Sequence, residues 1–155
     1  MRRLLFCLLL LVQVHSIEAK DDPKFKPTAE EQKILDGINK ERAKAKLPEL
    51  TANEVLFKLA RAHSENMAKQ DKLDHTLDGK GPAERAKDAG YKGLIGENCA
   101  KGDVTDPVEV VKGWMDSKLH RENILRKDFA EIGVGRARRA NGVYYYTLVF
   151  AIPMK

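Results

Sequence analysis

The sequence predicts a single α+β domain, because helical and strand-like patterns occupy separate parts of the chain. Apolar residues recur at helical spacing in the earlier part. Two strand-like runs follow near the end, at 132–135 and 143–151, with Asn141-Gly142 between them. An Asn-Gly pair between two such runs is a strong signal for a β-hairpin. Helices followed by an antiparallel hairpin indicate the α+β class.

Two long helices are expected first. Capping boxes begin at Thr28 and Thr51, where a hydroxyl side chain is followed three residues later by a glutamate. The first helix is expected to end at Pro48, because the residue before a proline disfavours helical backbone. The second helix carries one apolar stripe at helical spacing: Leu56, Leu59, Ala60, His63 and Met67. This places His63 on an apolar face.

Two further helices are expected after these. Pro82 suits the first position of a short helix that ends at Gly90, since the first N–H of a helix has no partner in any case. Another helix starts at Asp106-Pro107, where carboxylates favourably face the positive end of the helix dipole. The core face of this helix is expected to carry Val108, Val111 and Met115.

The first 19 residues are expected to form a secretory signal peptide. Arg2 and Arg3 precede an apolar run over residues 4–14, and Ala19 offers a small-residue cleavage site. The run is 11 residues long, whereas a membrane-spanning helix needs about 20. Cleavage would leave a flexible lead-in over 20–27 and one domain over 28–155, with no transmembrane segment.

Composition narrows the class of protein. The net charge of +5 is modest and mixed in sign, which gives no case for nucleic-acid binding. Of the two cysteines, Cys7 lies in the expected signal peptide, so Cys99 has no intramolecular partner. The domain is therefore expected to depend on its core alone after export, either secreted or in the periplasm.

Short motifs recur along the chain in an order that resembles one known family. They are HSENMA (63–68), DHT (74–76), GENCA (96–100), VVKGWMDS (110–117), HRENIL (120–125), FAEIGVG (129–135) and YYYTLVFA (144–151). GEN alone is a weak signal, but seven motifs in order are a strong one. They are similar to the CAP superfamily, or SCP domain, of cysteine-rich secretory proteins, antigen 5 and pathogenesis-related 1 proteins. The match is to its bacterial, disulfide-free branch, over roughly residues 30–151.

The resemblance implies an α-β-α sandwich, with a small antiparallel sheet between helical layers. It also implies a cleft lined by two histidines and two acidic residues, which in some members holds a divalent metal such as zinc. The first histidine matches His75, the first acid matches Glu97, and the second histidine matches His120. The second acid matches Ser117, so the set of four is incomplete. Asp116 would replace it only if the end of the helix turned its carboxylate inward, and Glu122 is the second candidate after Asp116.

The resemblance makes His75 and His120 the candidate metal ligands. Two neutral imidazoles and a carboxylate suit a zinc ion with an open fourth position. Glu97 is the candidate catalytic residue, and Asn98 and Asp116 complete the expected ligand cleft. These residues lack the spacing of a local metal motif such as HExxH, so without the resemblance His120 would be interpreted as a surface or capping histidine.

Other polar residues have simpler interpretations. On its apolar stripe, His63 is expected to be a hydrogen-bonded core histidine rather than a ligand. Cys99 is expected to be a buried, inert thiol rather than a nucleophile. Trp114 is expected in the core, and Asn98 is expected to satisfy backbone groups near the cleft.

The sequence is compatible with three functions. The first is an exported module that binds a divalent metal, or an unknown small-molecule, lipid or cell-envelope ligand. The second is a metal-assisted, protease-like hydrolase outside the cytoplasm, with Glu97 as general base. The third is a structural envelope protein whose cleft is vestigial.

Overall fold

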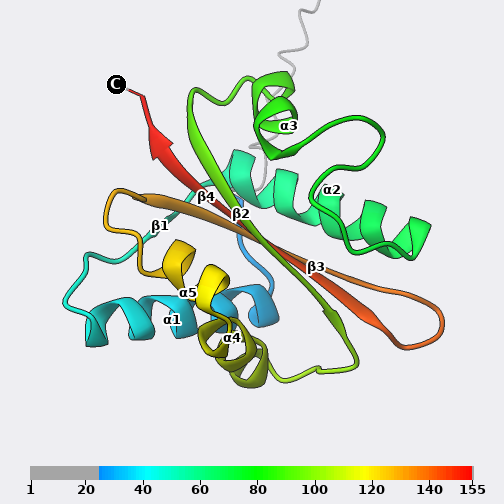
Figure 1. Cartoon of the computed structure of the whole chain (residues 1–155), viewed down its shortest axis with the longest axis horizontal. Helices are drawn as coiled ribbons and strands as arrows, with labels where there is room; N and C mark the ends of the chain where they lie inside the picture. The colour runs from blue at the N-terminus through cyan, green and yellow to red at the C-terminus, as the bar shows by residue number, and fades with distance from the viewer. Residues whose placement is uncertain (1–24, 155) are drawn as a thin grey trace, which may run out of the picture.

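The computed structural model describes residues 25–154 (Figure 1). The expected signal peptide and most of the expected lead-in lie outside these described residues. The helices and strands follow one another in this order: α1 (Ala29–Lys44), β1 (Thr51–Ala52), α2 (Glu54–Gln70), α3 (Pro82–Asp88), β2 (Gly93–Gly102), α4 (Pro107–Asp116), α5 (Lys118–Ile124), β3 (Glu131–Arg138) and β4 (Tyr144–Pro153). In the described part of the chain, no helix has both the length and the apolar character needed to cross a membrane.

The four strands form one sheet in the order β1-β3-β4-β2. The three long strands are antiparallel, and Gly142 at φ 92° forms the turn that the Asn-Gly pair predicts between β3 and β4. The two residues of β1 pair in parallel with β3, so the sheet is mixed rather than wholly antiparallel. The strand β2 lies at an edge and was not predicted.

Helices cover both faces of the sheet, which confirms the α-β-α sandwich (Figure 1). Side chains of β4 alternate between the two faces, as they must in a strand. Leu148 and Phe150 join the core cluster with α1, α4 and α5. Val149 and Ala151 instead pack against apolar residues of α2 on the opposite face. The core is therefore split into two parts by the sheet.

Two glycines of β3 let α2 lie directly on the sheet. A Cβ atom added at Gly133 would lie 2.0 Å from the carbonyl carbon of Leu56, and one at Gly135 would lie 2.1 Å from that of Ala60. Both distances are far below contact distance and involve backbone, which cannot move aside. The close approach brings the next turn of α2, which carries His63, down to the sheet.

Helix starts agree with prediction at α1 but not at α2. The capping box at Thr28 is confirmed, because Glu31 N donates to Thr28 Oγ1 at 3.3 Å and Thr28 N donates to Glu31 Oε2 at 2.8 Å. The box expected at Thr51 is wrong. Thr51 belongs to β1, where its N–H donates to Ala130 O at 2.9 Å, and Asn53 caps α2 instead.

The helix α4 begins where expected but presents a different face to the core. Val110, Val111 and Trp114 are buried, whereas Val108 is 69% exposed. The expected core position of Val108 is therefore wrong. Val108 lies in the first turn and borders a surface hollow between α1 and α4, so its side chain stays open to solvent.

Arg42 joins α1 to the segment that follows α5. Its guanidinium is fully buried and donates to four backbone carbonyls, at distances of 2.8 to 3.2 Å. The acceptors are the carbonyl oxygens of Pro48, Ile124, Arg126 and Phe129. Among the described residues, no carboxylate lies within salt-bridge distance of this guanidinium. The arrangement fixes the end of α5, which carries His120.

Candidate functional site

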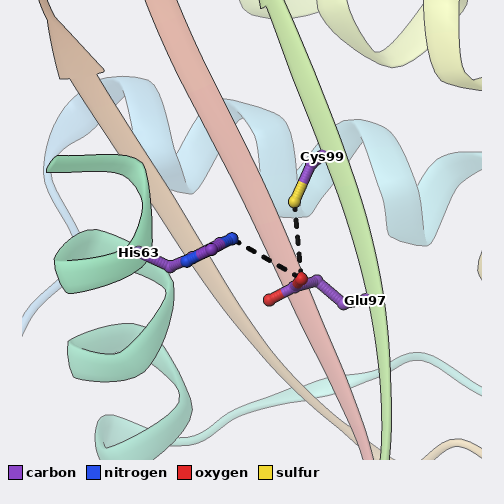
Figure 2. Close-up of side chains that lie close together, drawn as sticks. All are labelled: His63, Glu97 and Cys99. Carbon is purple, nitrogen blue, oxygen red and sulfur yellow. Dashed lines mark hydrogen bonds and ion pairs between the residues drawn. The ribbon is translucent and has the colours of Figure 1, made fainter. Parts of the chain in front are cut away.

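Glu97 is the centre of the candidate site. It lies on β2, is 8% exposed, and points with Cys99 toward the face of the sheet covered by α2 (Figure 2). Its two carboxylate oxygens have different partners. Oε2 accepts a hydrogen bond of 2.5 Å from Arg85 Nη2. Oε1 lies 2.8 Å from His75 Nδ1 and faces the other polar atoms of the site.

Arg85 was not predicted, yet it organises the site. It lies on α3, and its Nη1 donates to His75 O at 2.8 Å and to Lys80 O at 2.9 Å. One guanidinium thus holds both the Glu97 carboxylate and the loop that carries His75. No sequence signal indicated this role, because nothing local in α3 reveals that its arginine reaches β2.

His63 points from α2 toward the same carboxylate (Figure 2). It is 1% exposed, and its Nε2 lies 2.9 Å from Asp74 O and 3.7 Å from Glu97 Oε1. A carbonyl only accepts, so Nε2 carries the proton and Nδ1, which is buried without a partner, does not. Burial lowers the pKa of His63, which favours the neutral ring. The predicted hydrogen-bonded core histidine is confirmed, but its nearness to Glu97 was missed.

Cys99 completes a compact group around Oε1 of Glu97. Its Sγ lies 3.5 Å from Glu97 Oε1 and 3.7 Å from His75 Nδ1. The residue is 5% exposed, so its predicted burial is confirmed. Burial, followed by the nearby Glu97 charge, raises the pKa of the thiol, which is therefore protonated at neutral pH and donates to the carboxylate.

Charges in this group favour an ion pair between Glu97 and His75. Burial alone would raise the pKa of Glu97, but the hydrogen bond with His75 and the charge of Arg85 outweigh it and hold that pKa below its usual value. The same hydrogen bond raises the pKa of His75. The Glu97 carboxylate is therefore ionised and stabilised by its hydrogen bonds and by neighbouring positive charges. Because its pKa is lowered, it is a weak general base.

His120 lies on α5 at a neighbouring cleft. The cleft has a volume of about 370 Å³, and its mainly apolar lining includes Leu73, Cys99, Trp114, His120 and Tyr146. Burial lowers the pKa of His120, and the charge of His75 lowers it further, so the two imidazoles lie within electrostatic reach of each other. Trp114 is a buried core residue, as predicted, and also forms part of the wall.

Asn98 and Asn123 attach α5 to β2. Asn98 is fully buried, and its Nδ2 donates to His120 O at 3.0 Å. Asn123 Nδ2 donates to Asn98 Oδ1 at 2.8 Å. Asn98 thus satisfies backbone groups beside the cleft, in line with the sequence interpretation.

Asp116 does not point inward. Its side chain is 66% exposed, and its Oδ2 accepts a hydrogen bond of 2.6 Å from Lys112 Nζ. Ser117, which occupies the position of the missing acid, lines the cleft instead. The condition under which Asp116 would supply a second acid is therefore not met.

The donor atoms around Glu97 fit a divalent ion such as zinc. Within the described residues, His63, Glu97 and Cys99 form a group whose ligand atoms all lie within 4.8 Å of one another, and neither of the two histidines expected to bind the metal, His75 and His120, is part of it. Ligands of a tetrahedral zinc ion lie about 3.3–3.7 Å apart. Atoms of Glu97, His75 and Cys99 are 2.8 to 3.7 Å apart. Arg85 occupies only Oε2, whereas Oε1 is shared by His75 and Cys99, which would each have to release a proton for an ion to bind between these atoms.

Comparison with known proteins gives similar bacterial chains. YkwD of Bacillus subtilis is 45% identical over 111 residues, which are 70% of this chain and 42% of YkwD. An outer surface protein of Borrelia burgdorferi is 25% identical, with a TM-score of 0.75 over 83% of this chain and 97% of that protein. An extracellular protein of Bacillus anthracis with an SCP domain is 29% identical, with a TM-score of 0.71 over 79% of this chain and 40% of that protein.

The chain thus spans less than half of YkwD. The family model for the cysteine-rich secretory protein family, CAP, matches residues 35–150, which is most of the chain. This range includes every residue of the Glu97 group as well as His120. The chain belongs to the cysteine-rich secretory protein (CAP) family.

Proposed function

We propose that this chain acts outside the cytoplasm as a binding module and that it takes up a divalent metal ion, such as zinc, beside Glu97. Two imidazoles would contribute to binding this ion. His75 would be a direct ligand, and His120 would act from the lining of the adjoining cleft. The proposal depends on one observation, that the two oxygens of the Glu97 carboxylate have different partners. Arg85 binds Oε2, while Oε1 lies against the nitrogen of His75 and the sulfur of Cys99, which are both atoms that can bind a metal.

Similar proteins support two parts of this proposal, the location of the protein outside the cytoplasm and a metal ion as its ligand. The Borrelia burgdorferi relative is an outer surface protein, and the Bacillus anthracis relative is extracellular. NaASP2, which has a similar fold, was crystallised with Zn²⁺. At 16% identity that likeness concerns the fold alone, so the weight of the metal proposal rests on the donor atoms of this chain.

A binding role is favoured over hydrolysis by the state of the two acids. Glu97 has its charge engaged by Arg85 and His75, so little basicity remains for activating water. Asp116 is engaged by Lys112 at the surface. The apolar cleft beside His120 is where a small or cell-envelope ligand would bind next to the ion.

Calorimetric titration of zinc into the metal-free chain tests the proposal. Binding is expected at pH 7.5 and should weaken at pH 5.5, because protons compete for the imidazoles. His75→Ala should lower the affinity more than about 100-fold and His120→Ala by about 10–100-fold. Asp116→Asn is the matched control and should bind like wild type. Absence of zinc uptake by the wild-type chain at pH 7.5 would refute the metal proposal.

A further inference from the structure

Cys99 has surroundings that a purely structural thiol does not need. One side of the residue packs in a small core cluster with Met67, Leu77 and Tyr145. Its sulfur atom, however, lies against Glu97 Oε1 at 3.5 Å and His75 Nδ1 at 3.7 Å. An aliphatic side chain there would place a methyl group against a buried carboxylate. The chain instead has its one described cysteine, with a free thiol, at this point.

We infer that the sulfur of Cys99 is a ligand of the bound ion, together with Glu97 Oε1 and His75 Nδ1, so that the site selects thiophilic ions over hard ones. This inference rests on the proposed function, since it names the third ligand of that same site. Thiolate ligands favour zinc, cadmium and cuprous ions, whereas magnesium and calcium prefer oxygen ligands. Without sulfur, the site would offer only an imidazole and a carboxylate.

His75 is the imidazole best suited to join Cys99 and Glu97. Its Nδ1 is the nearest nitrogen to Oε1, at 2.8 Å, and its half-exposed ring gives an ion a route from solvent. His63 is also near, but its Nε2 donates to Asp74 O and therefore has no lone pair to offer in this arrangement. His63 is thus assigned to the wall of the site, where it keeps the carboxylate away from water.

A bound ion would favour the thiolate. Arg85 and Glu97 balance each other in charge, so a divalent ion would add two uncompensated positive charges to this buried group. Deprotonation of Cys99 removes one positive charge from this buried group. On binding, the S–H bond breaks, the metal–sulfur bond forms, and the proton passes to solvent; His75 Nδ1 gives up its proton in the same way. No oxidant or reductant is needed.

Cobalt(II) is the probe that reports sulfur ligation directly. Titration of Co²⁺ into the metal-free, reduced chain should produce the intense near-ultraviolet charge-transfer band of a cobalt–thiolate bond. Added zinc should abolish the band, and a large excess of magnesium should leave it intact. Cys99→Ser should lack the band and bind cobalt at least about 10-fold more weakly, because a hard oxygen replaces the soft sulfur. Asp116→Asn is the control and should keep the band, because Asp116 lies at the surface with Lys112 and away from the ligand atoms.

The outcomes separate this inference from the function it rests on. Cobalt or zinc binding by wild type without the band would overturn the sulfur ligand and leave the metal site in place. Equal affinity of wild type and Cys99→Ser would do the same. No binding of either ion would overturn both. Because the band is measured in the wild-type chain, the test does not depend on how stably any variant folds.

Discussion

Two buried cationic side chains in this molecule have opposite surroundings. Arg42 is fully buried, and backbone carbonyls satisfy its guanidinium on all sides. Arg85 is also largely buried, but it meets the ionised side chain of Glu97, which in turn contacts the half-exposed His75. The Arg42 group is closed to solvent, whereas the Glu97 group is open at one side.

The difference distinguishes a structural cluster from a site. Around Arg42, every hydrogen bond that its guanidinium makes within the described residues goes to a backbone carbonyl, and the guanidinium itself already occupies these oxygens. Around Glu97 the atoms are titratable or soft, one carboxylate oxygen faces them, and His63 Nδ1 is buried without a partner. Buried polar groups are normally paired, and exceptions are common at functional sites. Changes in the Arg42 group and in the Glu97 group are therefore expected to differ in their effects on stability, metal affinity and pH dependence.

Arg42→Met should have the largest effect on folding. The change leaves several buried carbonyls without a donor, so the free energy of unfolding should fall by about 3–5 kcal/mol. Urea denaturation would measure it. The matched control is Lys40→Met, an exposed position on the same helix, which should change stability by less than about 0.5 kcal/mol. Equal stability of the two variants would contradict the structural role of Arg42.

Arg85→Met should cost less stability but more function. The expected loss is about 1–3 kcal/mol, because the buried Glu97 carboxylate loses one partner but keeps its hydrogen bond with His75. Zinc affinity should fall by about 10–100-fold, since Glu97 and the loop of His75 are no longer oriented. Arg42→Met should leave the zinc affinity of the folded fraction nearly unchanged. Calorimetry would measure both zinc affinities. A larger loss of affinity in Arg42→Met than in Arg85→Met would contradict the assignment of Arg85 to the metal site and of Arg42 to the structural cluster.

The smallest effects should appear in the pH dependence of the metal-free chain. NMR titration should find the pKa of His75 above 6.5, because Glu97 stabilises its charge, and the pKa values of His63 and His120 below 6.5, because burial opposes theirs. The contribution of His75 to stability is present below about pH 6.5 and is lost as pH rises through its raised pKa.

His63 and His120, whose pKa values are lowered, have the opposite effect on stability. Their contribution is present above about pH 6.5 and is lost as pH falls through their lowered pKa values. Since His75 is half exposed, its contribution should be less than about 1 kcal/mol. Arg42 stays charged throughout and adds no pH dependence of its own. A pKa of His75 below that of His63 would contradict the ion pair with Glu97.

Local sequence signals predicted the elements that depend on local structure. The capping box at Thr28, the periodic stripe of α2 and the Asn141-Gly142 turn each act within a few residues, and each is present. The strand β2 was missed because its apolar and polar residues do not alternate clearly. The box at Thr51 was misplaced because pairing with β3, a long-range interaction, overrides the local cap.

The site was only partly predictable from the sequence, because several of its contacts join residues that are far apart in the chain. The family resemblance singled out His75, Glu97 and His120 as residues. It gave no indication that His63 approaches Glu97, since that depends on how closely α2 packs on Gly133 and Gly135. Arg85 was missed because its contact with Glu97 arises only when α3 folds back against β2.

The most direct test is to locate the ion in crystals of the zinc-loaded chain by anomalous scattering, with data collected on both sides of the zinc absorption edge. The predicted result is one strong peak in contact with Glu97 Oε1, His75 Nδ1 and Cys99 Sγ, with Arg85 still on Oε2. A peak at another place, or no peak beside Glu97 while the fold is as described, would contradict the assignment of the open group as a metal site.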